Sequence, residues 1–283
     1  MRLFLLTTLT MMAFAANSIL NRMALAGGHI DAVSFGTIRL ASGALMLALL
    51  CVLFRGGLKL GGPARLVGVL ALLIYMYGFS SAYTSLDAGL GALILFGMVQ
   101  ITMFAAACLT HEDMPALKWI GAALALVGLA WLIWPGPQAQ VSLLHGGLMA
   151  IAGIGWGFYS LAGRKSRDAL QATAANFVLA TPFGILALWV LPAPAEAVEM
   201  NSIGIALAIL AGTVTSGLGY ALWYTVLPSL ASSVAAVAQL TVPVIALLAG
   251  VVLLGEVVTL RIALASALIL GGVALSVLAK RPG

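Results

Sequence analysis

The chain has 283 residues, of which 63% are hydrophobic and 7% charged, and its formal net charge at pH 7 is +5. Soluble domains carry about 25% charged residues, so this composition excludes a soluble globule and indicates a chain committed to the membrane. The positive charge is spread over many loops, which argues against nucleic acid as a partner. The two cysteines, Cys51 and Cys108, both lie in apolar runs, and such a pair can form neither a disulfide framework nor a metal site.

Apolar segments follow one another along the whole chain, each close to the length of about 20 residues that a spanning helix needs. Their length and their lack of period-two alternation exclude a barrel of strands. The first segment lacks a convincing small-x-small cleavage motif, so we expect it to remain as the first helix. The ten predicted spans are Leu3–Met23, Val33–Phe54, Leu66–Tyr83, Gly89–Leu109, Lys118–Trp134, Leu143–Leu161, Ala172–Leu191, Ile203–Leu227, Ser233–Leu254 and Leu260–Leu278.

The loops between these spans alternate in charge. The Lys and Arg residues gather in every second loop and near the termini, whereas the intervening loops carry Asp31, Asp87, Glu196 and Glu199. Positively charged loops of multispanning proteins lie on the cytoplasmic side. We therefore expect both termini in the cytoplasm.

The second half of the chain repeats features of the first about 140 residues later. Glu112 to Leu132 aligns without a gap with Glu256 to Ser276, and Tyr83-Thr84 matches Tyr224-Thr225. Because five spans make each half, the second half enters the bilayer from the opposite face. Inverted repeats of this kind are typical of secondary transporters whose substrate site lies between the halves. The predicted five-helix repeats are residues 1–137 and 138–283.

Charged groups are scarce at membrane depth. All eight carboxylates lie at or near predicted span ends, which weakens a proton-coupled or cation-coupled drug carrier and leaves facilitated diffusion open. Arg39 is the one cation well inside a predicted span. It could bind a carboxylate or phosphate, or it could extend outward or cap helix carbonyl groups, and the sequence favours the structural role. A single buried cation disfavours phosphorylated substrates, which usually require more than one.

Aromatic residues mark three spans. All six tyrosines lie in the third, sixth and eighth, where Tyr75, Phe79 and Tyr83 share one helix face, as do Tyr220 and Tyr224. Such faces can pack against other helices or line a wet cavity, since phenol and indole groups in lipid need hydrogen-bond partners. With neutral amides near the midplane, a cavity of this kind suits a neutral amino acid or a similar small metabolite. The candidate substrate-binding residues are Phe14, Asn17, Tyr75, Phe79, Tyr83, Gln100, Trp156, Tyr159, Trp223, Tyr224 and Gln239.

These motifs resemble the drug/metabolite transporter superfamily, in its ten-span EamA-type branch. Leu254-Gly255-Glu256 matches the motif after the ninth span, Tyr-Thr pairs close the third and eighth spans, and Arg39 corresponds to the family's second-span arginine. The first-half counterpart of Leu-Gly-Glu is degraded to Thr110-His111-Glu112. Within the branch, the aromatic content of spans three, six and eight is most similar to the YddG-type exporters of aromatic amino acids.

The resemblance implies an all-α bundle of ten helices around a central cavity, in a bacterial inner membrane. Spans one, three, four, six, eight and nine would line the cavity, and spans five and ten would support packing. Glu112 and Glu256 would fasten helix ends or loops. We expect a monomeric carrier without cofactor or metal that exports neutral, especially aromatic, amino acids by alternating access, with uniport and proton coupling both open.

Two other transport functions and one enzymatic function compete with this interpretation. A broad multidrug or cation carrier is weakened by the lack of a carboxylate at membrane depth. A passive channel needs only a polar lining and stays open. An intramembrane enzyme needs a catalytic set inside the bilayer, but His29, His111 and His145 lie at span ends and no Gly-x-Ser-x-Gly motif occurs.

Overall fold

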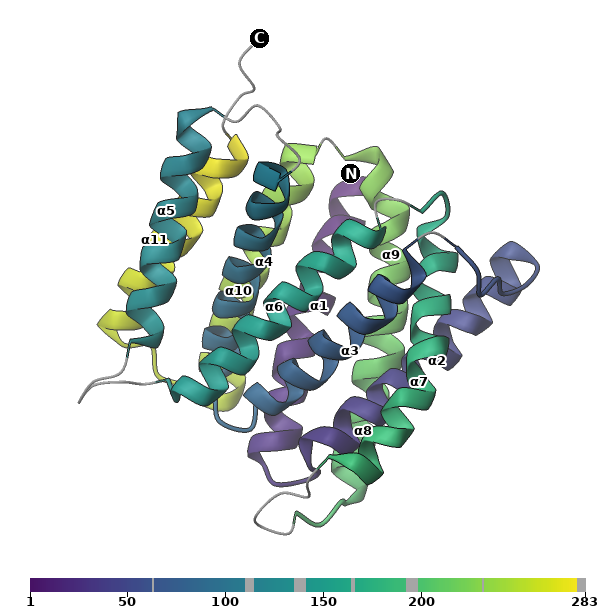
Figure 1. The fold of residues 1–283 in the computed structure, drawn as a ribbon. Helices are drawn as coiled ribbons and strands as arrows, with labels where there is room; N and C mark the ends of the chain where they lie inside the picture. Colours follow the sequence, from purple (N-terminus) through teal and green to yellow (C-terminus); the bar gives the residue numbers. More distant parts are fainter. Residues whose placement is uncertain are drawn as a thin grey trace.

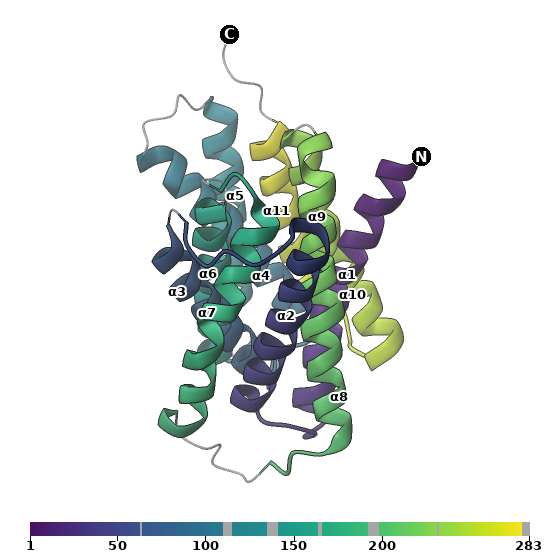
Figure 2. The same cartoon turned by 90° about the vertical axis from the view of Figure 1, so that its right-hand side faces the viewer.

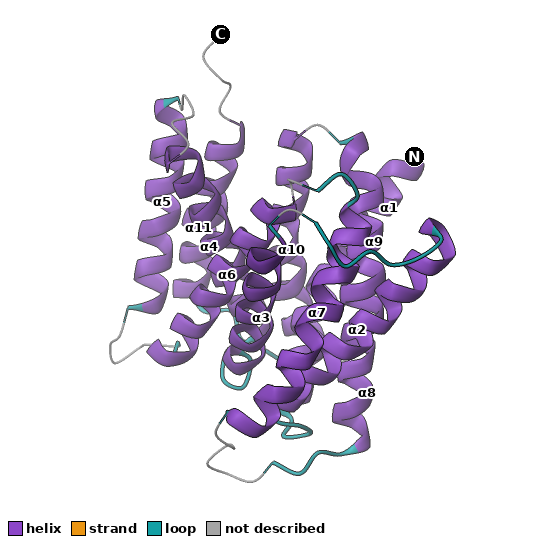
Figure 3. Cartoon of the chain, turned by 45° about the vertical axis from the view of Figure 1, so that its right-hand side comes forward, coloured by secondary structure: helices purple, strands orange, loops and turns teal. Residues whose placement is uncertain are grey.

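The structure is a computed structural model that describes residues 1–62, 64–109, 115–134, 141–163, 166–191, 198–230 and 232–278, with the side chains of residues 228 and 232–237 left aside. Within these ranges every regular element is helical (Figure 3). In chain order the elements are α1 (Arg2–Ala26), α2 (Ala32–Arg55), α3 (Arg65–Ala82), α4 (Ala88–Leu109), α5 (Ala116–Ile133), α6 (Leu143–Gly163), α7 (Ala169–Val190), α8 (Ser202–Leu210), the π-helix η1 (Ala211–Leu218), α9 (Gly219–Val226), the short 3-10 helix η2 (Leu227–Ser229), α10 (Ser232–Leu254) and α11 (Leu260–Leu278).

Eight helical segments among the described residues are long and apolar enough to cross a membrane. One of them, Ser202–Val226, is the continuous run of α8, η1 and α9. α6 is outside this set, and α10 contributes the shorter apolar stretch Ala238–Leu254. The prediction of an all-helical multispanning membrane protein is therefore confirmed, whereas the crossing of ten helices as two inverted repeats stays a prediction.

Polar side chains and glycine set the ends of several helices. Asp31 accepts hydrogen bonds of 2.9 Å from the backbone N–H groups of Val33 and Ser34 at the start of α2, and Asn201 caps α8 in the same way. These side chains satisfy backbone donors that have no partner inside the helix. α2 ends at Gly56, whose φ of 70° is the left-handed conformation that favours glycine.

Helices from the two predicted halves interleave. α2 packs on α7, α4 on α10, and α5 on α11, while α3 packs on α6 and α1 lies along α8, η1 and α9. Figure 2 shows α2 beside α7, and Figure 1 shows α5 and α11 together at one side of the bundle. α1 begins and α11 ends at the same end of the bundle, the upper end in Figure 1, which we call the terminal end. The halves therefore share one packed interior.

Glycine allows α5 and α11 to approach closely. A Cβ atom built on Gly272 would lie 2.5 Å from the carbonyl oxygen of Gly121 and 2.7 Å from the backbone nitrogen of Ala125. The hydroxyl of Ser276 donates to the carbonyl oxygen of Lys118 at 3.0 Å, which a wider separation would break. Small residues at such crossings bring helix backbones together where lipid supplies no hydrophobic driving force.

Gly272→Ala should destabilise the protein, because the added methyl group meets backbone atoms that have no room to move. Overpacking of this kind costs about 1–3 kcal/mol. Thermal unfolding of the purified protein in detergent, followed by tryptophan fluorescence, measures the loss. The matched control is Gly271→Ala, since an added Cβ there meets nothing within 4 Å. Equal unfolding temperatures for the two variants would contradict the close packing of α5 and α11.

Candidate functional site

Aromatic side chains from five helical elements meet in the interior around Trp156. The ring centroid of Trp156 lies 4.9 Å from that of Tyr75, 5.1 Å from Tyr220 and 5.3 Å from Tyr159, with the last pair stacked. Offset and tilted pairs at these distances are favourable beyond the burial of their area. The full set, which we call the aromatic cluster, is Phe14, Tyr75, Phe79, Tyr83, Trp156, Tyr159, Phe177, Tyr220 and Trp223.

The cluster extends in two directions from its centre. Along α3, the centroids of Tyr75 and Phe79 are 5.3 Å apart and those of Phe79 and Tyr83 are 4.7 Å apart. Across the bundle, Tyr220 contacts Phe14 of α1 at 5.8 Å and Phe177 of α7 at 5.9 Å. The ring contacts of the aromatic cluster therefore connect α1, α3, α6, α7 and α9.

The guanidinium group of Arg39 lies against the aromatic cluster. Arg39 is fully buried, and its Nε donates to the hydroxyl of Ser216 while its Nη2 donates to the hydroxyl of Tyr75, both at 3.0 Å. Its charged carbon lies 5.3 Å from the ring centroid of Tyr75 and 5.2 Å from that of Phe79. Arg39 thus turns inward onto hydroxyl groups and aromatic rings, and it neither extends outward nor caps helix carbonyl groups, the two structural roles considered from the sequence.

Amides continue the polar network toward α1. Asn17 donates from Nδ2 to the hydroxyl of Tyr75 at 3.3 Å, and its Oδ1 accepts from the hydroxyl of Thr215 at 3.1 Å. Asn21 donates to the carbonyl oxygen of Asn17 at 2.8 Å, and its Oδ1 accepts from Ser80 at 3.2 Å. The hydroxyl of Tyr75 is therefore shared between an amide and a guanidinium.

The π-helix η1 positions the hydroxyl groups of Thr215 and Ser216. Single-turn π segments occur often at functional sites, because the wider turn changes which side chains face inward. At Gly212 an added Cβ would collide with the carbonyl oxygen of Arg39 and the hydroxyl of Ser42. Glycine at that position thus lets η1 approach α2 closely enough for Ser216 to reach Arg39.

Eight of the eleven predicted site residues lie in or beside the aromatic cluster: Phe14, Asn17, Tyr75, Phe79, Tyr83, Trp156, Tyr159 and Trp223. Gln100 and Gln239 are half-buried on α4 and α10 with no described hydrogen bond to it, and Tyr224 is half-buried on α9 without a described ring contact. The sequence interpretation left out Phe177, Thr215, Ser216 and Tyr220. Only Tyr220 carried a usable signal, since it shares a helix face with Tyr224.

Ion pairs join α1 to two loops at the end of the bundle opposite the terminal end. Nη2 of Arg22 lies 3.2 Å from Oδ1 of Asp87, and its Nε lies 3.7 Å from Oε1 of Glu256. Glu256 also accepts a 2.7 Å hydrogen bond from the backbone N–H of Ala88, the first residue of α4. Glu256 therefore fastens a helix end, as expected, whereas Glu112 lies outside the described residues.

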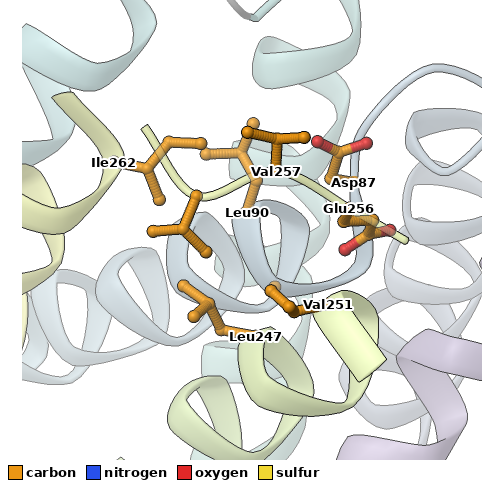
Figure 4. Close-up of a pocket in the computed structure, with 9 residues that line it drawn as sticks. Asp87, Leu90, Leu247, Val251, Glu256, Val257 and Ile262 are labelled. Atoms are coloured by element: carbon orange, nitrogen blue, oxygen red, sulfur yellow. The ribbon is translucent and has the colours of Figure 1, made fainter. Parts of the chain in front are cut away.

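Two cavities are described, and neither touches the aromatic cluster. One of about 10 Å³ lies beside Asp87 and Glu256, between Leu90, Leu247 and Ile262 (Figure 4). The other, of about 200 Å³, is apolar and lies between α4, α10 and α11, with Leu93, Pro243 and Ser266 among its lining residues. Among the described residues, no group of three His, Cys, Asp or Glu side chains is placed to hold a metal ion.

The stability of the Glu256→Gln variant, relative to that of the native chain, should increase as the pH rises. Burial raises the pKa of Glu256 above its ordinary value, although the N–H of Ala88 and Arg22 act in the opposite direction. A carboxyl group whose pKa is higher in the folded protein contributes its full stability below the pKa of the unfolded chain, about 4.3. This contribution is lost as the pH rises through the pKa of the folded protein. Glutamine keeps an acceptor for the N–H of Ala88 and carries no charge at any pH.

Unfolding temperatures of the native chain and the variant, measured between about pH 4 and pH 8, test this expectation. The difference should move in favour of Glu256→Gln with rising pH. Glu199→Gln, at an exposed position, is the control for loss of one carboxylate. A difference that moves toward the native chain as the pH rises would overturn the burial argument.

Comparison with known proteins identifies the family. The sequence profile of the EamA-like transporter family matches residues 1–134 and 146–278. The chain is 46% identical over 285 positions to uncharacterized protein PA1977 of Pseudomonas aeruginosa, covering 100% of this chain and 96% of that relative. A solved structure described as "Crystal structure of protein" is similar with a TM-score of 0.65 and 19% identity, over 96% of this chain and 98% of that one, which is a likeness of fold alone. Because the profile spans nearly the whole chain, this protein belongs to the EamA-like transporter family of the drug/metabolite transporter superfamily.

Proposed function

We propose that this transporter exports neutral, especially aromatic, amino acids and related small metabolites across a bacterial inner membrane by alternating access. The observation that carries the proposal is the aromatic cluster with its polar network, in which side chains of both predicted halves meet. An amphipathic solute with a planar side chain needs ring faces for its apolar part and hydrogen-bonding groups for its polar part. Trp156 and Tyr220 supply the first, and Asn17 and Arg39 the second.

Burial along the central helices supports a carrier that opens at one end. Every residue of α4 from Ala88 to Gly97 is buried, whereas most of those from Met98 to Leu109 are partly exposed. In α1 it is the second half that is packed: no residue from Arg2 to Leu9 is buried, whereas Asn17 to Ile19 are buried. The packed halves of α1 and α4 both lie near the ion pairs of Arg22. With the termini in the cytoplasm, as the loop charges predict, this is a carrier closed toward the outside.

The packing of the helices supports the inverted repeat that alternating access requires. If residues 1–137 and 138–283 are equivalent units, α1 corresponds to α6, α2 to α7, and α3 to the run of α8, η1 and α9. The contact of α3 with α6 then has its counterpart in the contact of that run with α1, and α2 packs on its own counterpart, α7. Two such units can exchange conformations so that the site faces each side in turn.

Uniport by a single protomer is the mode that we propose. The described carboxylates, including Asp31, Asp87 and Glu256, lie in loops or at helix ends, so none is at the depth where a proton relay usually sits. A cationic drug would meet the buried positive charge of Arg39, which disfavours the multidrug alternative. The continuous rings of the aromatic cluster disfavour an open pore.

Trp156→Ala should lower the initial rate of counterflow about tenfold or more, since it removes three ring contacts of about 0.5–1.5 kcal/mol each from the site. Proteoliposomes loaded with unlabelled phenylalanine and given labelled phenylalanine outside, without a pH gradient, provide the measurement. Phe158→Ala is the matched control, because Phe158 lies on the same helix and is 49% exposed. Its rate should stay within about twofold of the native rate.

Two outcomes would reject the proposal. Saturable counterflow that Trp156→Ala and Phe158→Ala reduce equally, at equal protein levels, would move the site elsewhere. Absence of counterflow with phenylalanine, tryptophan, threonine and methionine, together with uptake of lipophilic cations, would favour a multidrug carrier.

A further inference from the structure

Arg39 is a buried cation without an anionic partner. The side chain is fully buried, and each of its hydrogen bonds goes to a neutral hydroxyl group, of Ser216 or Tyr75. The ion pairs described in the structure join Arg22 to Asp87 and Glu256, and Arg55 to Asp168, all at helix ends. A guanidinium removed from water without an anion is costly, and in membrane spans such groups usually mark a substrate or ion site.

Two hydrogen-bond donors in this region make no described hydrogen bond. One is Nη1 of Arg39, and the other is the hydroxyl of Tyr220, a side chain that is 4% exposed and interacts with Tyr75 and Arg39. A buried donor without an acceptor costs about 1–3 kcal/mol. Both belong to one neighbourhood, since Tyr75 holds Nη2 of Arg39 and its ring lies 4.9 Å from Trp156, which is 5.1 Å from Tyr220.

We propose that Nη1 of Arg39 and the hydroxyl of Tyr220 receive the carboxylate of the transported substrate. The inference rests on the proposed function and narrows its substrate class to monocarboxylates with an aromatic or other large apolar side chain. A carboxylate has two acceptor oxygens, one for each unpartnered donor. A phosphate ester, with two charges, would find only one cation.

The surroundings of Arg39 fix the direction of the free donor. Ser216 holds Nε and Tyr75 holds Nη2, so the planar guanidinium has one orientation and Nη1 is the group left for a ligand. The rings of Tyr75 and Phe79 stabilise the cation while the site is empty. The substrate's own side chain then lies on the rings around Trp156.

The same geometry makes the substrate's ammonium group dispensable. No carboxylate of the described residues lies in the aromatic cluster, and the Oδ1 atoms of Asn17 and Asn21 already accept hydrogen bonds. Binding should therefore depend on the carboxylate far more than on the amine. This distinguishes the site from one that recognises both ends of a zwitterion equally.

Binding by the purified full-length protein to four named ligands tests the proposal. These are L-phenylalanine, 3-phenylpropionate without the amine, L-phenylalaninamide without the carboxylate, and inorganic phosphate. Quenching of tryptophan fluorescence and ligand-dependent unfolding temperature give two readouts. We expect L-phenylalanine and 3-phenylpropionate to bind, and the amide and phosphate to bind at least about tenfold more weakly.

Tyr220→Phe is the decisive variant, because it removes only a hydroxyl that makes no described hydrogen bond in the empty protein. Its unfolding temperature should be unchanged or higher, while its affinity for 3-phenylpropionate falls about 10- to 100-fold. Tyr77→Phe is the matched control, since that hydroxyl bonds to Thr37 at 2.8 Å outside the cluster, and its loss should leave affinity unchanged. Arg39→Gln should abolish the preference for carboxylates over the amide.

The outcomes separate this inference from the proposed function. Binding of 3-phenylpropionate that requires Tyr220 and Arg39, without counterflow of any amino acid, would support the carboxylate site and reject amino acid export. Equal binding of L-phenylalanine and its amide would overturn the carboxylate site, even where counterflow succeeds. Native affinity in Tyr220→Phe would likewise overturn it.

Discussion

The bilayer offers no water to buried polar groups, so polar groups of the interior are stabilised by partners inside the protein. In this chain that constraint centres on the hydroxyl of Tyr75, which accepts from both Asn17 and Arg39. Those two bonds hold α1, α2 and α3 together, and the bonds of Arg39 and Asn17 to Ser216 and Thr215 add η1. The relative positions of four helical elements thus depend on one polar network within the aromatic cluster.

Small residues make that network geometrically possible. Ser216 reaches Arg39 only because Gly212 allows η1 to lie against α2, and the wide turn of the π-helix presents Thr215 and Ser216 on the inner side. On the other side of the bundle, glycine at positions 121 and 272 brings α5 onto α11, where the hydroxyl of Ser276 donates to the carbonyl oxygen of Lys118. Close approach therefore allows a buried network of several polar side chains in one place, and close packing of two helices with a single hydrogen bond in the other.

The sequence predicts the helices well because hydropathy and glycine or proline breaks act locally. The predicted span Ile203–Leu227, for example, matches the observed helical run Ser202–Val226. The aromatic face of α3 also follows from spacing alone. The orientation of Arg39 does not, since a long side chain can extend outward or inward and only its neighbours on η1 and α3 decide. Phe177 had no local signal, because it joins the cluster through contacts made by tertiary packing.

The aromatic cluster is physically connected to the ion pairs at the end of the bundle opposite the termini. From Tyr75 the ring contacts run through Phe79 to Tyr83, whose hydroxyl donates to the carbonyl oxygen of Ala88 at 3.0 Å. The N–H of the same residue donates to Glu256, which also pairs with Arg22. A ligand that shifts the ring of Tyr75 therefore acts on a row of tilted and edge-on ring contacts that ends at the α3–α4 corner. Because close-packed interiors rearrange between discrete states and deform little, such a shift is passed on to the bonds of Glu256. In the carrier proposed above, this would couple the occupied site to the end opposite the termini.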